Sequence, residues 1–154
     1  MTRVSATITV PGRAVHAERV WYDPARWASW IDGFGHVVSL DDDWPRKGAR
    51  RLWDSPPQGR GRVSETVLAY EMRIGQSLEV EDARLSGTQS VTFEPQPESV
   101  KITLTLDYRL KDRNLITPLV DLLFIRRALN DSLRRTLRRF NSELAAERQF
   151  GGAR

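Results

Sequence analysis

One long amphipathic helix is predicted for residues 115–147, LITPLVDLLFIRRALNDSLRRTLRRFNSELAAE. Its apolar side chains recur at steps of three, four or seven residues, a spacing that keeps them on one side of a helix. The members of this stripe are Leu115, Leu119, Leu122, Leu129, Leu133, Leu137, Phe140 and Leu144. A stripe of this length requires a large apolar partner in the rest of the chain.

The residues before the helix predict that partner, because apolar and polar side chains alternate over residues 100–110. Alternation with a period of two is typical of an antiparallel strand with one buried face. The apolar side is formed by Val100, Ile102, Leu104, Leu106, Tyr108 and Leu110, and the polar side by Lys101, Thr103, Thr105, Asp107 and Arg109. We therefore expect a sheet whose apolar face packs against the last helix.

Short helices and strands are predicted for the rest of the chain. Residues 4–10 alternate as a first strand, and two short helices follow at 17–22 and 24–30. Further strands are predicted near residues 36–40, 49–53, 61–72, 76–83 and 88–94, with the register of the later ones left open. This order of one strand, two short helices, about six sequential strands and a long helix contains no β-α-β alternation and indicates the α+β class.

The composition is that of one domain without disulfides. A chain of 154 residues suits a single core, so we expect one domain over residues 1–148 and a frayed tail over residues 149–154. It contains no cysteine, which excludes a disulfide framework and thiolate metal sites. No apolar run approaches the roughly 20 residues of a membrane span, and no apolar leader is visible, so the sequence predicts a cytoplasmic protein.

Basic side chains are concentrated at the end of the chain. Residues 111–154 hold ten basic and five acidic side chains, whereas residues 1–110 hold fourteen and fifteen. A solvated helix face explains most of the arginines there: Arg127, Arg134, Arg135, Arg138 and Arg139. The alternative is contact with nucleic acid or an acidic membrane. Nucleic-acid binding is disfavoured, because no aromatic side chains alternate with these arginines and acidic residues dilute their charge.

Recognisable catalytic motifs are scarce in this chain. His16 and His36 are the only histidines and have no third ligand at a suitable spacing, so neither a metal site nor a cofactor is predicted. Without cysteine or a Gly-x-Ser-x-Gly turn, covalent acyl transfer has no nucleophile. Residues 59–62 do not match a phosphate-binding loop, and the acidic residues 41–43 are interpreted as a solvated turn. A hydrolase or a nucleotide-dependent enzyme is therefore disfavoured.

Four local patterns connect the chain with a known superfamily: AERVW at 17–21, DPARWASW at 23–30, GAR at 48–50 and RRAL at 126–129. With these patterns and its order of elements, nearly the whole chain resembles the START-related helix-grip (SRPBCC) superfamily. That superfamily includes birch pollen allergens, lipid-transfer domains and polyketide cyclase/dehydrase proteins. The resemblance implies a seven-stranded antiparallel sheet wrapped around the last helix, an apolar cavity between them and an entrance near the short helices. It does not imply one chemistry, since fold alone does not determine function.

A ligand cavity of this kind would be lined by residues from several predicted elements. Trp30 ends the second short helix, where the resemblance places the entrance, and its indole offers an apolar face and an N–H. Trp21 and Trp27 are interpreted as core residues instead. The expected ligand-binding set is Trp30, Trp53, Phe93, Leu104, Leu106, Tyr108, Leu119, Leu122 and Arg126.

Arg126 is the charged residue of that set, and two interpretations are open for it. Leu122, Leu129 and Leu133 lie at helical spacings from it, so its side chain starts on the apolar stripe. An unpaired buried guanidinium would be very costly. Arg126 therefore either pairs with a carboxylate or extends past the sheet to water, or it meets an anionic ligand group inside the cavity.

Two residues are candidates for acid–base catalysis in such a cavity: Tyr108, on the apolar side of its strand, and Arg51. Arg50 and Arg51 are adjacent on one strand, so only one of them points inward, and the sequence leaves open which. The competing interpretation places Tyr108 in a hydrogen bond within the core and both arginines in water.

Together these patterns predict an α+β helix-grip domain, monomeric or weakly dimeric, that binds a small hydrophobic molecule. The expected ligand is a lipid, a polyketide-like or an isoprenoid-like compound, bound without a metal or cofactor. A second hypothesis is a polyketide cyclase or dehydratase that works by acid–base chemistry in the same cavity. A third is an interaction module that uses the basic last helix.

Overall fold

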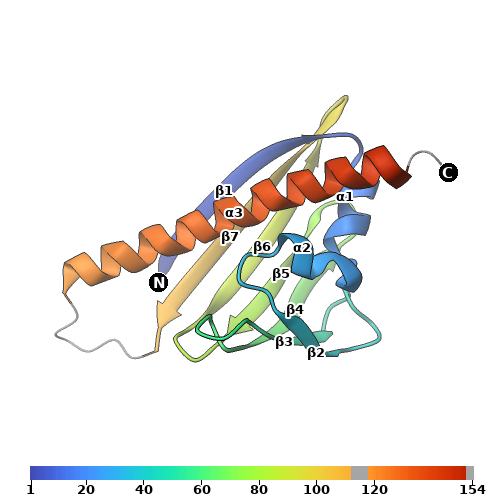
Figure 1. The fold of residues 1–154 in the computed structure, drawn as a ribbon. Helices are drawn as coiled ribbons and strands as arrows, with labels where there is room; N and C mark the ends of the chain where they lie inside the picture. Colours follow the sequence, from blue (N-terminus) through green and yellow to red (C-terminus); the bar gives the residue numbers. More distant parts are fainter. Residues whose placement is uncertain (112–117, 152–154) are drawn as a thin grey trace.

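The protein folds as a curved antiparallel sheet that wraps around a long C-terminal helix (Figure 1). This computed structural model describes residues 1–111 and 118–151. The elements in chain order are β1 (Thr2–Pro11), α1 (Ala14–Trp21), η1 (Pro24–Arg26), α2 (Trp27–Trp30), β2 (His36–Leu40), β3 (Arg50–Asp54), β4 (Arg62–Glu71), β5 (Gly75–Glu81), β6 (Leu85–Pro95), β7 (Ser99–Leu110) and α3 (Leu119–Gly151). The predicted α+β helix-grip fold is confirmed.

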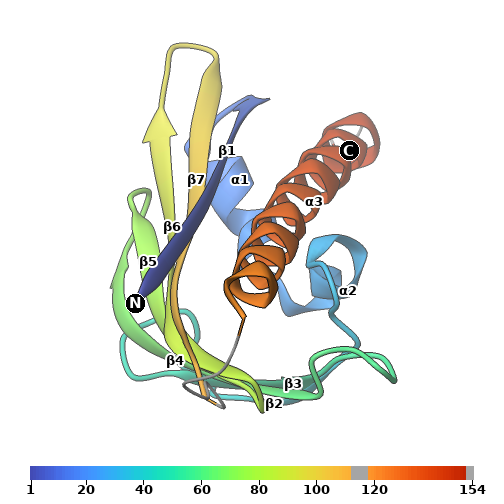
Figure 2. The ribbon, with the colours of Figure 1, turned by 90° about the vertical axis from the view of Figure 1, so that its left-hand side faces the viewer.

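The sheet contains seven strands in the order β1-β7-β6-β5-β4-β3-β2, and every neighbouring pair is antiparallel. The first strand therefore lies at one edge beside the last strand, while the other strands follow one another as a meander. Ala6 lies opposite Leu104, and Leu104 opposite Val91, so each row of the inner face is built from distant parts of the chain. Figure 2 shows this face curving around α3.

Irregular pairing accompanies the curvature of the sheet. The register shifts between Val37 and Ser39 in β2 and between Val67 and Ala69 in β4, and bulges of this kind bend a strand. The strands β6 and β7 pair in regular register and approach each other closely at Gly87. A Cβ atom at Gly87 would lie only 2.0 Å from a backbone carbonyl oxygen of β7, so this approach requires glycine.

The short helices after β1 are fixed to α3 by capping and charge. The Asp23 side chain caps η1 by accepting a hydrogen bond at 3.0 Å from a backbone N–H of that turn. Arg26 then reaches α3, where its Nη1 lies 3.3 Å from Oε1 of Glu143 and its Nη2 pairs with Glu147. These contacts hold the short helices over the C-terminal half of α3, as Figure 1 shows.

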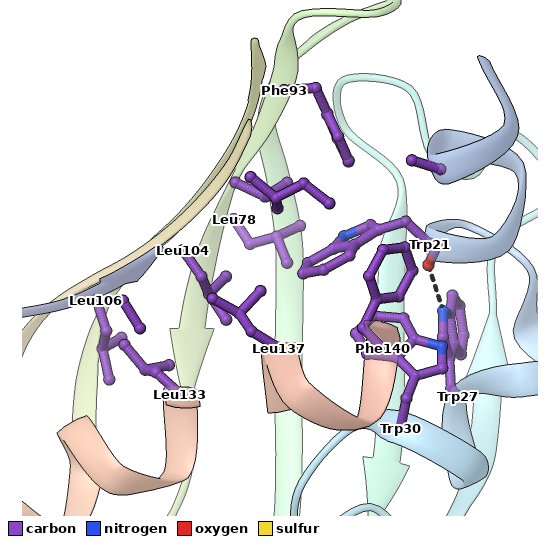
Figure 3. Close-up of a cluster of buried hydrophobic side chains, with 14 of the residues drawn as sticks. Trp21, Trp27, Trp30, Leu78, Phe93, Leu104, Leu106, Leu133, Leu137 and Phe140 are labelled. Atoms are coloured by element: carbon purple, nitrogen blue, oxygen red, sulfur yellow. Dashed lines mark hydrogen bonds between the residues drawn. The ribbon is translucent and has the colours of Figure 1, made fainter. Parts of the chain in front are cut away.

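The hydrophobic core lies between the sheet and the second half of α3. Leu133, Leu137, Phe140 and Leu144 are buried there, in agreement with the predicted stripe. Figure 3 shows the buried side chains around Phe140. Leu119, at the other end of the stripe, is 71% exposed. The apolar stripe therefore packs on the sheet over only part of its length.

The ends of α3 differ from the prediction. The helix runs to Gly151, so residues 149–151, which were expected to fray, are helical. No apolar periodicity is needed for this extension, because adding a residue to an existing helix forms another backbone hydrogen bond. Leu115 lies outside the described residues, as do residues 152–154. Within the described part of the chain, no helix is both long and apolar enough to cross a membrane.

Candidate functional site

A cavity of about 80 Å³ lies between the inner face of the sheet and the middle of α3. Alternation along β5, β6 and β7 brings every second side chain to this face, and α3 closes the cavity from the other side. The apolar wall consists of Leu78, Val80, Val91, Leu104, Leu106, Leu129 and Leu133, and the aromatic wall of Trp21, Trp30 and Trp53.

A buried ion pair forms a polar section of the cavity wall. Nη2 of Arg51 on β3 lies 2.8 Å from Oε2 of Glu65 on β4, and Nε of Arg51 lies 3.2 Å from Oε1. The Trp53 indole N–H donates to the same carboxylate. The guanidinium carbon of Arg51 lies 4.4 Å from the ring centroid of Trp27 and 4.7 Å from that of Trp44. Hydrogen bonds and aromatic faces therefore compensate both buried charges.

A second charged group, Asp32, connects the end of α2 with α3 at the cavity. Its carboxylate accepts hydrogen bonds from Ser132 at 2.6 Å, from Nη2 of Arg135 at 3.0 Å and from Arg139 at 3.2 Å, while its backbone N–H donates to Thr136. Burial acts to raise the pKa of Asp32, but the hydrogen bonds and positive charges outweigh it and the pKa lies below its usual value. Asp32 is thus held as a carboxylate between two elements of the site.

Trp30 carries a polar atom that the protein leaves without a partner. Its ring centroid lies 4.5 Å from that of Trp21 and 5.0 Å from that of Phe140, in the aromatic cluster of Figure 3. The indole N–H is buried and has no hydrogen-bond acceptor among the described residues. By contrast, the neighbouring Trp27 indole donates to the backbone oxygen of Trp21 at 2.8 Å. An unpaired buried donor is costly, so a ligand oxygen near Trp30 would gain a hydrogen bond there.

The wall of the cavity is chemically mixed, with eleven apolar or aromatic residues and eight polar or charged ones: Asp32, Arg51, Arg60, Glu65, Gln76, Gln89, Ser132 and Thr136. Both carboxylate oxygens of Glu65 already accept hydrogen bonds from protein donors. Among residues 1–111 and 118–151 no cluster of three or more histidine or acidic side chains is placed to hold a metal ion. A wall of this composition offers both an apolar surface and fixed hydrogen-bonding groups.

Residues 1–145 match the sequence model of a family described as polyketide cyclase / dehydrase and lipid transport. The chain belongs to this family. No curated protein matches the sequence. The match to the family model confirms the resemblance to the helix-grip superfamily that the sequence patterns predicted.

Several solved structures share the fold of this family member. An aromatase/cyclase, Zhui, from a Streptomyces species is 13% identical, with a TM-score of 0.81 and coverage of 98% of both chains. A START superfamily protein from Mycobacterium smegmatis is 14% identical, with a TM-score of 0.73 over 94% of this chain and 97% of its own. Truncated norcoclaurine synthase from Thalictrum flavum is 11% identical, with a TM-score of 0.67 over 93% and 92%. At these identities the likeness establishes the fold alone.

The structure of this family member divides the predicted ligand-binding residues between two places. Trp30, Trp53, Leu104 and Leu106 line the cavity together. Phe93 is buried beside Trp21 in the core, with ring centroids 5.9 Å apart, and is not part of the cavity wall. The remaining predicted residues line a separate open pocket near the start of α3: Tyr108, Leu119, Leu122 and Arg126.

The two open questions about arginine are answered by the structure. Arg51 points into the cavity, whereas the Arg50 side chain is exposed and lies beside Asp41, with its Nε 3.5 Å from Oδ2. The Arg126 side chain is exposed, in no ion pair with the described residues, at the edge of the open pocket. Burial raises the pKa of the nearby Tyr108, while the positive charge of Arg126 opposes this shift. Arg126 therefore reaches water past the sheet.

Neither Glu65 nor Asp32 was predicted from the sequence as a site residue. A signal for Glu65 exists, because Val63, Glu65 and Val67 share one phase of alternation and the two valines are apolar. A carboxylate in phase with buried residues needs a cation opposite it, and the register places Arg51 there. Asp32 lies in a segment without periodicity, and no comparable signal identifies it.

Proposed function

We propose that this protein binds a small, mostly apolar molecule carrying one or two polar groups, in the cavity between the sheet and α3. The observation that carries the proposal is the composition of the cavity wall. Leucine side chains from the sheet and from α3 face one another there, and polar side chains such as Gln76 and Gln89 lie among them. A lipid, a polyketide-like or an isoprenoid-like compound has this combination of a long apolar body and a few oxygens.

Burial of the apolar body would supply most of the affinity. Each square ångström of apolar surface removed from water stabilises a complex by roughly 25 cal/mol. The Trp30 N–H, for which the described residues offer no acceptor, would orient a ligand oxygen once the cavity has opened beside it. The ion pair between Arg51 and Glu65 presents a fixed dipole to the same chamber, since its two charges are held in place by aromatic rings and hydrogen bonds.

Binding requires the cavity to expand. Its volume of about 80 Å³ is well below the roughly 300–1,000 Å³ of pockets that hold drug-sized ligands. The first half of α3 is the part able to move, because Ile125 and Leu129 are only half-buried whereas Leu133, Leu137 and Phe140 anchor the second half. Displacement of these early turns from the sheet would enlarge the cavity toward the open pocket without breaking the core.

Native mass spectrometry of freshly purified protein tests the proposal. We expect an adduct that survives gentle desolvation and is released as a hydrophobic compound by organic extraction. Protein that carries no adduct, and that also fails to take up fatty acids, isoprenoid alcohols or aromatic polyketides added to it, would contradict the proposal.

A second candidate function is the cyclisation or dehydration of a polyketide-like substrate, and the ion pair of Arg51 and Glu65 is the observation that favours it. The guanidinium would polarise a substrate carbonyl and the carboxylate would accept a proton. Both oxygens of Glu65 already accept hydrogen bonds from Arg51 and Trp53, so proton transfer would first require one of these hydrogen bonds to break.

An incubation experiment tests this second function. Wild-type protein and the variant Arg51→Met are each incubated with reactive precursors of the extracted compound, and turnover is measured. Unchanged conversion by Arg51→Met would exclude this role.

A further inference from the structure

The first turns of α3 expose a group of apolar side chains away from the cavity. Leu119 is 71% exposed, Val120 73%, Leu123 54% and Phe124 72%. Figure 1 shows this part of the helix, in orange, extending past the ends of β1 and β7. We call these four residues the α3 apolar patch. Clusters of large exposed apolar side chains mark contact sites more often than isolated ones do.

The α3 apolar patch continues into a basic surface along the same helix. At helical spacing, position 127 shares the side of the patch, and Arg134 follows it two turns later, with the acidic Asp131 between them. Both arginines are exposed, as is Arg126 at the border of the patch. Neither Arg126 nor Arg127 forms an ion pair with any residue of 1–111 or 118–151. Asp121 is the one acidic residue in the first turn of the helix.

We propose that the start of α3 docks on an anionic lipid surface. Helices that lie in a membrane interface combine leucine and phenylalanine side chains with arginines that meet lipid headgroups. The patch supplies the apolar side chains, and Arg126 and Arg127, which pair with no acidic side chain of the described residues, supply positive charge beside them. This surface is separate from the cavity, so the inference holds whether or not the cavity binds a ligand.

Two other occupants fit the patch less well. A second copy of this chain would have to accommodate the exposed Arg126 and Arg127 of both copies within one interface, where like charges repel each other. Single-stranded nucleic acid binds through stacked aromatic side chains, but the patch offers one phenylalanine beside three aliphatic residues. Anionic lipid suits both the aliphatic side chains and the arginines.

Docking would bring the open pocket close to the lipid. Leu119 and Leu123 of the patch also line that pocket, together with Tyr108 and Leu122. An apolar molecule leaving the lipid at this point would meet the leucines of this pocket. This consequence, unlike the docking itself, depends on the proposed ligand-binding function.

Co-sedimentation with vesicles tests the docking. Wild-type protein is expected to bind vesicles of equal parts phosphatidylcholine and phosphatidylglycerol, to bind phosphatidylcholine vesicles much more weakly, and to dissociate as salt is raised. The double variant Leu123→Ser, Phe124→Ser should lose about a hundredfold in affinity for the charged vesicles. The double variant Arg126→Ser, Arg127→Ser should lose about thirtyfold.

Matched controls use exposed side chains at other positions. Met72→Ser with Ile74→Ser removes two exposed apolar residues from the turn between β4 and β5, and Arg13→Ser with Arg19→Ser removes two exposed charges near α1. Both control proteins should bind vesicles like wild type, and circular dichroism should show the same fold for every variant. Equal binding to neutral vesicles, or equal losses in the controls, would overturn the proposal. It would also be overturned if wild-type protein were a dimer that Leu123→Ser with Phe124→Ser converts to a monomer.

Discussion

Arg51 and Glu65 lie directly opposite each other on β3 and β4, with Nη2 of the arginine 2.8 Å from Oε2 of the glutamate and both side chains less than a tenth exposed. A buried pair of this kind adds little net stability by itself, because removing two charges from water offsets their attraction. Breaking it is costly, since one charge is then left buried without a partner.

Replacement of Glu65 by glutamine should therefore lower the free energy of unfolding by about 3 kcal/mol. The double variant Arg51→Met, Glu65→Leu should recover most of that loss, because neither charge remains. Urea titration followed by circular dichroism measures both effects. Arg62→Ala breaks an exposed pair with Asp54 on the same two strands and should have little effect. If the double variant were as unstable as Glu65→Gln, a buried unpaired charge would not be the cause.

Alternation in β7 and helical spacing in α3 were sufficient to predict the inward side of these two elements, but not how far the packing extends along them. Leu104 and Leu106 were placed correctly, because a strand with one apolar face leaves no choice of side. Leu119 and Leu122 follow the same helical stripe, yet they line the open pocket and not the cavity. Spacing fixes the side of a helix that a residue occupies, whereas the position of the sheet along that helix depends on the tertiary fold.

The polar part of the site depends on register, which the sequence left open. The choice between Arg50 and Arg51 follows from which of them lies opposite Glu65 on its buried side. The absence of an acceptor for the Trp30 N–H is a property of the packed structure and has no local signature. The fold was thus predictable from patterns within single elements, while the site required knowledge of how the elements meet.

A comparison of two tryptophans tests the assignment of an unpaired donor. Trp27 and Trp30 are both buried, but the Trp27 N–H donates to the oxygen of Trp21, whereas the Trp30 N–H has no acceptor in the described part of the chain. Replacement by phenylalanine removes the same volume at each site. Trp27→Phe should therefore be the less stable variant, by about 1 kcal/mol, because it alone leaves a buried carbonyl unpaired. Equal free energies of unfolding in urea would contradict the assignment.

The lowered pKa of Asp32 implies that the free energy of unfolding depends on pH. Burial alone would raise the pKa of this carboxyl, but Arg135, Ser132 and Arg139 lower it below the usual 3.8 in the folded state. Because the Asp32 carboxyl has a lower pKa in the folded state than in the unfolded state, its ionised form stabilises the folded protein. This contribution is fully present above pH 3.8 and is lost as the pH falls through the folded-state pKa.

The variant Asp32→Asn isolates that contribution. It should unfold at lower urea concentration than wild type at neutral pH, and the difference should shrink as the solution is made more acidic than the folded-state pKa. Asp42→Asn, at an exposed turn, serves as the control and should match wild type throughout. A difference between Asp32→Asn and wild type that is the same in acid and at neutral pH would show that the charge of Asp32 is not the source.

Filling the cavity should abolish ligand binding while the fold is retained. Leu106→Trp enlarges a side chain on the sheet wall, and Leu129→Trp enlarges a half-buried one on the opposite wall in α3. Overpacking costs typically about 1–3 kcal/mol, and the half-buried site tolerates it better because its side chain can turn toward solvent. Both variants should lose the adduct in native mass spectrometry, whereas Val38→Trp, at an exposed position on β2, should keep it. Retention of the adduct by both cavity variants, with circular dichroism unchanged, would place the ligand elsewhere. The open pocket at the start of α3 would then be the site to test, because Leu122 and Tyr108 lie there.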